Sequence, residues 1–410
     1  MYKNINTCPI TNSTDRITYL DLGDMPLVND LNSSKFDSIH CKKFPLAIQL
    51  FTESMLSTLT VEIDPRILYT NYLYRSGISA PYINHCKEMF NFVDYYLHLK
   101  NTDNILDIGG NDGALLKTFL SIKPELNVLN IDASKNLTEY ASKNNIPSIN
   151  AFWNFDTAKI INKKFKLITT TNCFQHTLDI NSFVQGIKTS LDKYGIWCLE
   201  FPYLKTILET NQFDQAYHEH IYHYMIQPLE LLFNKHNLRI IKITQHPIHG
   251  GTIRLLISHV SSLGEGWQPC NYSVLQTKNN ENSINIDTYI NWGNNIKTVI
   301  NNAYAFISDI KNNGAKIVGF GAAAKGCIFL NAANINHEHI DYIIDDTELK
   351  QYKFIPGTGI EVLPRTILLT DKPDYILILA HNFSEYIMQS LRDYGYTGKF
   401  ILLLPEPQIL

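Results

Sequence analysis

Two long stretches of this sequence alternate short apolar runs with helix-like segments, and this alternation restricts the fold more than any other feature. The apolar runs of the first stretch are NILDIGG (104–110), NVLNIDA (127–133), KLITTTN (166–172) and GIWCLEFP (195–202). Those of the second are KIVGFGAAAKG (316–326), DYIIDD (341–346), YILILAH (375–381) and KFILLLP (399–405). Such runs between helical segments predict parallel strands in sheets that carry helices on both faces. We therefore expect an α/β protein with two Rossmann-like, doubly wound domains.

The remaining sequence predicts a third, smaller domain and the boundaries of all three. A chain of 410 residues is long enough for two or three domains. Residues 1–65 show short strand and turn patterns with little sign of a helix, so we expect a small N-terminal domain over 1–68. Residues 262–285 are polar and rich in turn formers, which indicates a boundary or an exposed connection. This places a central domain at 69–262 and a C-terminal domain at 263–410.

Composition argues against several classes of partner. The formal net charge is −4 without a dominant basic block, which disfavours nucleic acid. No apolar run is long enough to cross a bilayer and the start is not of the secretory type, so we expect a cytoplasmic protein without a membrane partner. The seven cysteines form no CxxC pair, which predicts reduced thiols. Nothing resembles a coiled coil, and we expect a monomer.

A glycine-rich turn follows the first apolar run of the central domain. Its polar and glycine residues are Asp107, Gly109, Asn111, Asp112 and Gly113. Glycines allow a positive φ and a close approach of a ligand to the backbone. The next apolar run ends in Asp132, about 20 residues past the turn, where a carboxylate can accept hydrogen bonds from both ribose hydroxyls. The pattern differs from GxGxxG and is typical of an S-adenosylmethionine (SAM) site; the alternative is a βα turn in which the acid only caps a helix.

A second glycine turn, GFGAAAKG (319–326), follows the first apolar run of the C-terminal domain. Backbone amides at the start of a helix suit a phosphate, and Lys325 adds a positive charge nearby. Lys350, Gln351 and Pro356 belong to a second polar loop farther along the chain. We predict a nucleotide-like ligand here; the alternative is a turn in which the glycines only permit close packing.

The segment NQFDQAYHEHIYHY (211–224) contains three histidines, three tyrosines and two carboxylates. It follows the apolar run that ends near Glu200 and Tyr203, at the carboxyl edge of the predicted sheet, where ligands of α/β proteins bind. The segment NCFQH, with Asn172 and His176, follows the run before it. We expect these segments to converge over the sulfonium of SAM.

The chemistry of this cluster admits three interpretations. A metal site is disfavoured because His218 and His220 share a face only in an extended segment, and the spacing is not HExxH. A neutral histidine among tyrosines can instead accept a proton, while the tyrosines stabilise an enolate oxygen. The third interpretation is a surface loop whose histidines cap helices.

Together these motifs resemble those of the sugar C-methyltransferases that act on dTDP-4-keto-deoxysugars, such as the enzymes that make tetronitrose. The resemblance covers nearly the whole chain. The matching stretches are YLYRSGIS (72–79), ILDIGGNDGALL (105–116), NCFQH (172–176), EFPYL (200–204), NQFDQAYHEH (211–220), HGGTIR (249–254), GFGAAAKG (319–326), LKQYKFIPGTGI (349–360) and LAHNF (379–383). That family has a small zinc-binding N-terminal domain, a central SAM-binding domain and a C-terminal Rossmann-like domain that contacts the dTDP.

The resemblance implies a role for each matched position. His220 is expected to remove the C3 proton of the sugar, and Tyr217, Glu219 and His176 to line the sugar site with Tyr72 or Tyr74. The expected cofactor contacts are Asp107, Gly109, Asn111, Asp112, Gly113, Asp132 and Asn172. The expected contacts to the nucleotide-sugar substrate are Glu200, Tyr203, Asn211, Gly321, Lys325, Lys350, Gln351, Pro356 and Asn382. A C–H next to a ketone is acidic because its carbanion delocalises as an enolate, which can attack the methyl group of SAM.

The N-terminal sequence departs from the family pattern of two CxxC pairs that hold a zinc ion. The corresponding positions read CPIT (8–11) and FTES (51–54), so only Cys8 remains of four ligands. One cysteine cannot make a structural zinc site. We predict that this domain folds without zinc, and we assign no metal ligand. His218 and residues 222–224 would add hydrogen-bonding groups that tune the choice of sugar. Methylation at another position or at oxygen, and a binding protein without catalysis, are the alternatives.

Overall fold

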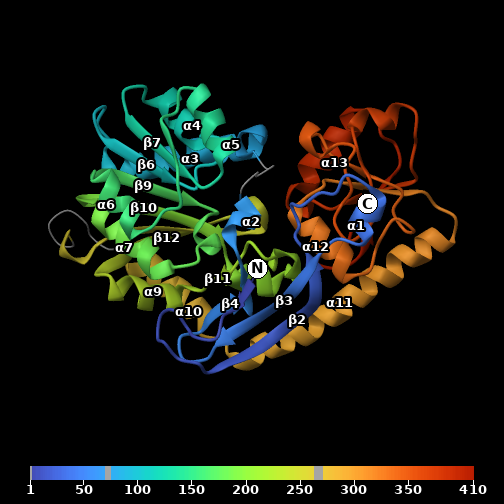
Figure 1. Cartoon of the computed structure of the whole chain (residues 1–410), viewed down its shortest axis with the longest axis horizontal. Helices are drawn as coiled ribbons and strands as arrows, with labels where there is room; N and C mark the ends of the chain where they lie inside the picture. The colour runs from blue at the N-terminus through green and yellow to red at the C-terminus, as the bar shows by residue number, and fades with distance from the viewer. Residues whose placement is uncertain (1, 70–74, 263–270) are drawn as a thin grey trace.

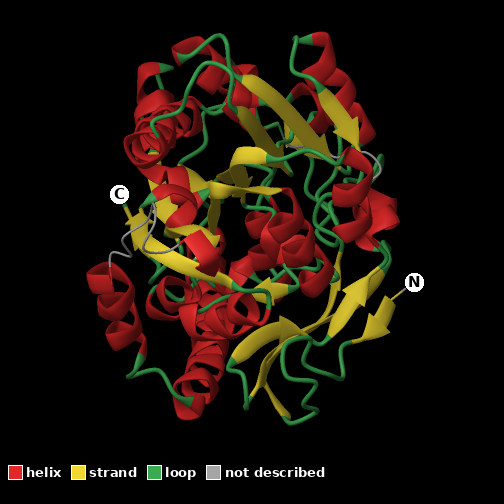
Figure 2. Ribbon diagram, turned by 90° about the vertical axis from the view of Figure 1, so that its left-hand side faces the viewer, coloured by secondary structure: helices red, strands yellow, loops and turns green. Residues whose placement is uncertain are grey.

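In the computed structural model, which describes residues 2–69, 75–262 and 271–410, the chain forms two large lobes joined by a smaller N-terminal unit (Figure 1). The central domain lies on the left of the view, the C-terminal domain on the right, and the N-terminal strands below and between them. Figure 2, turned by 90°, shows the strands near the N-terminus as a separate group at one end of the molecule. None of the helices in these ranges is long and apolar enough to cross a membrane.

A seven-stranded sheet forms the centre of the central domain, in the order β12-β13-β10-β9-β6-β7-β8. Its strands are β6 (Asn104–Ile108), β7 (Asn127–Asp132), β8 (Ser148–Asn150), β9 (Phe165–Thr171), β10 (Leu191–Pro202), β12 (Leu238–His246) and β13 (Thr252–His259). The five neighbouring strands β10, β9, β6, β7 and β8 are parallel to one another. Strand β13 is antiparallel to β10, and β12 is antiparallel to β13. The four apolar runs of the first stretch are therefore β6, β7, β9 and β10, as the sequence predicts.

Helices cover both faces of this sheet because successive strand residues point to opposite sides. The helices are α3 (Ala80–Leu97), α4 (Ala114–Ile122), α5 (Lys135–Lys143), α6 (Phe155–Ile161), α7 (Ile180–Ser190), α8 (Leu204–Glu209) and α9 (Ile226–Lys235). Ile105 packs in one apolar cluster with α3 and α4, whereas its neighbour Leu106 packs in another with α6, α7 and α9. The Ser79 side chain caps α3 by accepting a hydrogen bond from the Tyr82 amide.

The C-terminal domain has a six-stranded sheet in the order β16-β15-β14-β17-β18-β19. Its elements are β14 (Ile317–Phe320), α12 (Ala324–Ala332), β15 (Ile343–Ile344), β16 (Val362–Leu363), β17 (Tyr375–Ile378), α13 (Ser384–Asp393), β18 (Lys399–Leu402) and β19 (Gln408–Ile409). All pairs are parallel except β18 with β19. The four apolar runs of the second stretch become β14, β15, β17 and β18, which confirms the predicted fold class of two Rossmann-like domains.

The N-terminal sheet takes one strand from the central part of the sequence. Its order is β11-β4-β3-β2, and a two-stranded sheet of β1 and β5 lies beside it. The elements are β1 (Tyr2–Asn4), β2 (Arg16–Pro26), α1 (Lys35–Ile39), β3 (Lys43–Phe51), β4 (Leu56–Leu59), β5 (Val61–Ile63), α2 (Pro65–Tyr69) and β11 (Tyr222–His223). In the antiparallel ladder of β11 and β4, Tyr222 pairs with Thr58 and His223 with Ser57. The end of the histidine-rich segment is thus held by the N-terminal unit.

The predicted boundary at 262–285 contains α10 (Asn271–Glu281), which is a packed helix and not an exposed connection. The Ser273 hydroxyl accepts a hydrogen bond from the Ile243 amide of β12, and Glu281 accepts one from the Ile226 amide of α9. The sequence is polar because these contacts, and not an apolar stripe, hold the helix. It leads into α11 (Ile286–Asn312), where Gly293 approaches β2 so closely that a Cβ would lie 1.6 Å from the Tyr19 carbonyl oxygen.

Candidate active site

His220 lies buried between the 3-10 turn η3 (Phe213–Gln215) and β11, and its hydrogen bonds define its tautomer. Its Nδ1 is 3.0 Å from the Gln215 carbonyl oxygen, which can only accept, so Nδ1 carries the hydrogen. Its Nε2 is therefore the acceptor, and the Tyr217 hydroxyl donates to it over 2.6 Å. Burial lowers the pKa of His220 well below its usual value, with smaller contributions from His176, His223 and Lys325. His220 is a neutral base.

His176 comes from the 3-10 turn η2 (Phe174–His176) after β9, and its ring meets the His220 ring edge-on at 4.9 Å. Burial lowers the pKa of His176 to about 4, so this ring is also neutral at pH 7. Tyr69, at the end of α2, has its hydroxyl 3.0 Å from His176 Nδ1. No motif of the sequence points to Tyr69, although it stands three residues before the YLY motif. Tyr72 and Tyr74 of that motif lie outside the described residues.

Glu219 joins the same site through a contact that comes from the N-terminal unit. Its side chain is buried, and its Oε1 accepts a hydrogen bond of 2.6 Å from Asn29 Nδ2. The motif predicts Glu219, but nothing in the sequence points to Asn29, which is 190 positions away. The structure therefore brings together Tyr217, Glu219, His220 and His176, and adds Tyr69 and Asn29.

The prediction that His218 and residues 222–224 add hydrogen-bonding groups which tune the choice of sugar meets a different arrangement in the structure. His218 points to the N-terminal unit, where its Nε2 lies 3.3 and 3.2 Å from the Phe44 and Pro45 carbonyl oxygens. The Tyr222 hydroxyl donates to the Leu178 carbonyl, and Tyr224 stacks on Phe174. These three side chains are occupied elsewhere because the chain enters the β11–β4 ladder here.

His223, in contrast to these three side chains, lies close enough to the site to contribute to the low pKa of His220. It is buried, and neither ring nitrogen has a hydrogen-bond partner in the part of the chain that the structure describes. In the same part, no group of three or more His, Cys, Asp and Glu side chains is arranged to hold a metal ion.

The first glycine turn presents two carboxylates at the carboxyl ends of β6 and β7. Asp132 accepts backbone hydrogen bonds from Asn111 (2.9 Å) and Ser134 (2.8 Å). Asp107 Oδ1 accepts one of 2.8 Å from the Thr169 hydroxyl, while its Oδ2 has no partner among the described residues. Burial raises the pKa of Asp107 to about 7. Asp107 and Asp132 therefore lie where the sequence predicts them.

Several neighbouring groups fit a ligand with hydroxyl and amino donors. Asn172 Oδ1 and Asn130 Oδ1 are buried and have no hydrogen-bond partner within the described ranges. Gly109 has a φ of +71°, and a Cβ there would lie 2.4 Å from Cys173 Sγ. The glycine therefore lets the turn pack against Cys173. SAM carries ribose hydroxyls and amino groups, so the unpaired acceptors suit it.

Asn111, Asp112 and Gly113 serve the turn in a different way. Asn111 Oδ1 accepts the Ser76 amide (3.2 Å), and Asp112 accepts the Ser76 hydroxyl and the Gly77 amide. They hold the 3-10 turn η1 (Ser76–Ile78) over the glycine turn. Gly113 has a φ of +77° and is the N-cap of α4.

Three predicted substrate contacts in the central domain are engaged inside the protein. Glu200 is fully buried and pairs with Arg254 and with His85 Nε2 at 2.8 Å. Burial opposes its ionisation, but the His85 hydrogen bond and the Arg254 charge hold its pKa at about 2. The Tyr203 hydroxyl donates to Glu281 Oε1 over 2.6 Å, and Asn211 Oδ1 accepts from Asn295 Nδ2.

The second glycine turn is also occupied by internal partners. The Ala322 amide donates to Asp345 Oδ2 at 2.8 Å, so it is already paired with an anion. Lys350 Nζ donates to the Ala322 carbonyl (2.7 Å) and lies 3.7 Å from Asp345 Oδ2. The Gln351 amide group donates to the Asp345 carbonyl. Gly321 has a φ of +93°, which only glycine adopts readily.

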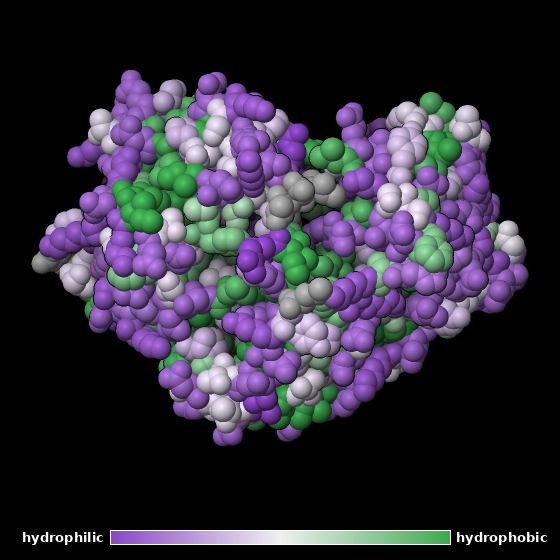
Figure 3. All heavy atoms as spheres, in the orientation of Figure 1, coloured by the Kyte–Doolittle hydropathy of each residue, from purple (hydrophilic) through white to green (hydrophobic). Residues whose placement is uncertain are grey.

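The loop with Pro356 is attached to the N-terminal unit. The Ser38 hydroxyl, in α1, donates to the Ile355 carbonyl (2.6 Å), and the Gly357 amide donates to the Ser38 carbonyl (2.8 Å). Lys325 and Asn382, in contrast, lie at the seam between the C-terminal and central domains, next to η3 and to the 3-10 turn η4 (Ile248–Gly250). In the view of Figure 3 the surface is hollowed between these two domains.

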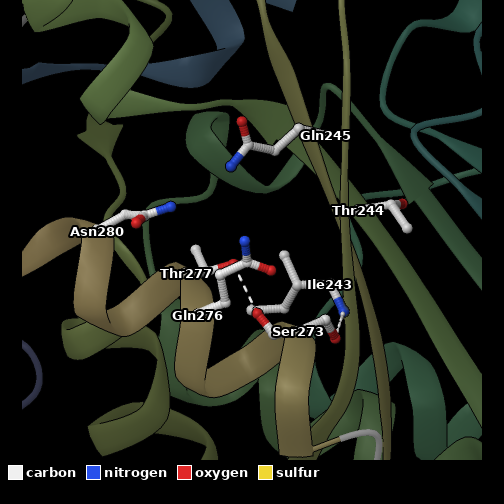
Figure 4. A pocket seen from close by; sticks show the side chains of 7 residues that line it. All are labelled: Ile243, Thr244, Gln245, Ser273, Gln276, Thr277 and Asn280. Carbon is white, nitrogen blue, oxygen red and sulfur yellow. Dashed lines mark hydrogen bonds between the residues drawn. The ribbon is translucent and has the colours of Figure 1, made fainter.

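A separate shallow pocket lies between β12 and α10, and none of the predicted site residues lines it (Figure 4). Its lining is formed by Ile243, Thr244, Gln245, Ser273, Gln276, Thr277 and Asn280. The hydrogen bond from the Ile243 amide to Ser273 Oγ ties the helix to the strand, while Thr277 Oγ1 donates to the Ser273 carbonyl within the helix. It contains no ionisable side chain that acid–base chemistry could use.

The positions of the family's zinc ligands form a small packed cluster in the N-terminal unit. Cys8 Sγ lies 3.2 Å from Ser54 Oγ, and both residues are fully buried. Phe51, at another of the four positions, is buried in the same core. Because Cys8 is the one sulfur ligand there, a hydrogen bond and apolar contacts occupy the place of four metal bonds.

Comparison with known proteins agrees with the motifs. A methyltransferase domain model matches residues 83–243, and a model described as the C-methyltransferase C-terminal domain matches residues 247–405. The curated protein C-methyltransferase NovU from Streptomyces niveus is 26% identical over 410 residues, which cover 99% of this chain and 97% of that protein. The resemblance to a C-methyltransferase family is thereby confirmed along both large domains.

Solved structures match the chain over less than half of its length. The plantazolicin methyltransferase BpumL in complex with SAH has 15% identity and a TM-score of 0.35, covering 42% of this chain and 82% of the other. An S-adenosylmethionine-dependent methyltransferase from Clostridium acetobutylicum ATCC 824 has 13% identity and a TM-score of 0.35, covering 43% of this chain and 92% of the other.

Proposed function

We propose, on the premise that this chain belongs to the SAM-dependent C-methyltransferases, that it methylates C3 of a nucleotide-linked (dTDP-type) 4-keto-6-deoxysugar. The observation that carries the proposal is the buried pair of Tyr217 and His220, in which Nε2 of a neutral imidazole accepts the tyrosine hydroxyl. Transfer of a methyl group to carbon needs a carbanion, and a carbon next to a ketone gives one when a base removes its proton. A neutral buried base is suited to that step.

The hydrogen bonds of the pair determine where the proton goes. The Gln215 carbonyl holds the hydrogen on Nδ1, so Nε2 is the atom that gains a proton. As the Tyr217 oxygen takes the C3 proton, its own hydrogen passes to Nε2 across the 2.6 Å contact. The pair gains one proton in total and becomes an imidazolium with an intact tyrosine. Its positive charge then lies beside the negative enolate oxygen, which it stabilises.

The surrounding groups exclude water and orient the sugar. His176 packs edge-on against His220 and is itself neutral, so it adds no competing charge. Glu219, held by Asn29, supplies a carboxylate that can accept hydrogen bonds from sugar hydroxyls. Asn382 Oδ1 is buried without a hydrogen-bond partner among the described residues, and it offers an acceptor from the C-terminal domain.

SAM supplies an electrophilic methyl group when it is bound. Asp132 would accept the ribose hydroxyls. Asp107 and Asn172 would accept hydrogen bonds from its amino groups through the oxygens that have no partner among the described residues.

The first experiment is deuterium exchange at C3 of dTDP-4-keto-6-deoxyglucose in D₂O, without SAM, read by mass spectrometry. We expect the unmodified protein to exchange the proton and His220→Ala to be slower by about 10²–10⁴-fold, the usual contribution of a general base. His218→Gln is the matched control, because His218 bonds to the Phe44 and Pro45 carbonyls and a glutamine can replace that donor. This control should exchange at the normal rate.

A second step adds SAM and a panel of nucleotide 4-keto-6-deoxysugars. A product methylated at C3 by the unmodified protein and not by His220→Ala agrees with the proposal. Methylation of a hydroxyl without exchange at C3 would instead show an O-methyltransferase. Binding of SAM without a product from any sugar of the panel would rule out this substrate class.

A further inference from the structure

The C-terminal domain contacts the segment that carries His220 through the turn η3. Phe213 packs against Phe329 of α12, with ring centroids 5.1 Å apart. Beside this apolar contact, Asp214 Oδ2 lies 3.4 Å from His381 Nδ1 of the 3-10 turn η8 (His381–Phe383). Asp214 is fully buried, and neither of its oxygens has a hydrogen bond within the described ranges. A carboxylate in such a place requires a cation nearby.

Lys325, in the first turn of α12, provides that cation. Its Nζ donates a hydrogen bond of 3.1 Å to the His249 carbonyl oxygen of η4. Burial lowers the pKa of Lys325 to about 8, and the charge of Asp214 opposes this fall. Lys325 is therefore protonated at pH 7, and its ammonium group contacts the central domain.

Three hydrogen bonds, which run through the His249 carbonyl and Gln215, connect this ammonium group to the base. The His249 carbonyl that accepts Lys325 also lies 3.4 Å from Gln215 Nε2. The backbone carbonyl of the same Gln215 accepts the hydrogen on His220 Nδ1 over 3.0 Å. Asp214, whose charge raises the pKa of Lys325, directly precedes Gln215, so this carboxylate and the partner of the base lie in one turn of the chain.

The turn that presents the His249 carbonyl is built around the domain contact. His249 has a φ of +56°, a strained value for a residue with a side chain, and Gly250 has a φ of +87°. A Cβ at Gly250 would lie 2.4 Å from Asn382 Oδ1 of the C-terminal domain. A backbone in this conformation persists only where surrounding contacts hold it, and here they come from both domains.

We propose that Lys325 is a positioning residue for proton removal: it holds the turn that carries Gln215 and His220, and its charge offsets the negative charge that develops on the substrate. This rests on the proposed function, and it replaces the expectation that Lys325 binds the phosphates of the nucleotide. The charge of Lys325 acts on His220, and a cation that close to the reacting centre favours an enolate over its neutral ketone. The C-terminal domain thus contributes to the proton transfer as well as to substrate binding.

The titratable groups that face Lys325 are Asp214 from η3, His249 from η4, His381 from η8 and His220. Burial lowers the pKa of His249 to about 4 and also lowers that of His381. At pH 7 the three histidines are neutral, so Lys325 is the group among these that carries positive charge. The groups that face His220 are Tyr217, His176, His223 and Lys325.

The test is the titration of His220 by NMR in protein with ¹³C-labelled histidine, without substrate. We expect Lys325→Met to raise the pKa of His220 by about one unit, a tenfold change in proton affinity, because a nearby positive charge is removed. Lys316→Met is the matched control: Lys316 immediately precedes β14, in the same domain, and pairs with Asp371. An unchanged His220 titration in folded Lys325→Met would overturn the proposal.

Calorimetry with dTDP distinguishes a positioning residue from a phosphate ligand. A positioning role predicts a Kd for dTDP within about twofold of normal in Lys325→Met, whereas loss of a charged hydrogen bond to phosphate would weaken it tenfold or more. Weakening by that amount contradicts the proposal. If dTDP does not bind the unmodified protein, the titration of His220 decides alone, and the substrate assignment fails separately.

Asp214→Asn covers the case in which Lys325→Met does not fold. It keeps the lysine but removes the charge that favours its protonated form, so the pKa of Lys325 falls further. The rate of C3 exchange should then decline at a lower pH on the alkaline side. An alkaline limb that stays in place would contradict the role of the pair.

Discussion

The two glycine turns of this protein share one plan but differ in what fills them. In the central domain, Asp132 accepts the amides of Asn111 (2.9 Å) and Ser134 (2.8 Å). In the C-terminal domain, Asp345 accepts the amides of Ala322 (2.8 Å) and Thr347 (2.8 Å). In each domain the carboxylate, Asp132 or Asp345, lies at the end of the second strand of the domain. It accepts one amide from the glycine turn and one from the residue two positions after the carboxylate.

The difference lies in the charges beside the two carboxylates. Lys350 neutralises Asp345 and also binds the Ala322 carbonyl, so the second turn is closed by its own chain. The first turn has no such lysine within the described residues, and it leaves the buried oxygens of Asp107 and Asn172 unpaired. A buried polar atom without a partner costs free energy unless a ligand pairs with it. We therefore propose that the same local pattern makes a ligand site in one domain and a structural turn in the other.

The largest effect that we expect comes from opening the second turn. Lys350→Met leaves the buried Asp345 carboxylate without its cation, which should lower the free energy of unfolding by about 3 kcal/mol or more. Urea unfolding measures it. Lys316→Met, which removes a more exposed pair with Asp371, should cost less than about 1 kcal/mol. Equal losses in the two variants would mean that Lys350 does not close the turn.

The next largest effect concerns the affinity for SAM, which should depend on Asp132 and not on Asp345. Asp132→Asn removes a charged acceptor for the ribose hydroxyls and should weaken SAM binding by about 10–100-fold. The equivalent change in the other turn, Asp345→Asn, should leave the Kd for SAM within about twofold. Isothermal calorimetry gives both values. A similar loss in both variants would contradict the assignment of SAM to the first turn.

The smallest effect is a pH dependence from Asp107, whose pKa burial raises to about 7. Between about pH 4 and pH 7 the unfolded chain has lost this proton while the folded protein keeps it, so this group makes stability fall as the pH rises. Asp107→Asn removes the dependence, and the variant should gain stability relative to the unmodified protein from pH 5 to pH 7. Urea unfolding at several pH values tests it; a constant difference would mean that Asp107 is ionised throughout.

The sequence predicts the strands well because apolar runs of strand length are a local signal. Both sets of four runs form strands at the predicted places, and the order of strands and helices follows from them. The sequence does not predict helix α10, because it is held by hydrogen bonds such as those from Tyr203 and Ile226 to Glu281, and such contacts leave no apolar period in the sequence.

Part of the site could also be predicted, because motif residues at the carboxyl ends of parallel strands meet at one edge of a sheet. Asp107, Asp132 and His176 follow this rule. Tyr69 and Asn29 do not, since they reach the site from α2 and from a loop of the N-terminal unit. The sequence also does not predict which way the side chains of residues 211–224 point. His218 and His220 are two residues apart but bond to different domains.

The two doubly wound domains, the acids of the glycine turns and the candidate base can all be read from the amino-acid sequence. The packing of the folded chain is needed to see that β11 completes the N-terminal sheet, that Lys350 closes the second turn and that Lys325 contacts the central domain at η4. The physical reason is the distance along the chain over which each kind of interaction acts. Strand runs and turn residues reflect the conformation of a few neighbouring residues, whereas the partner of a buried charge is chosen by packing between segments that are far apart in the chain.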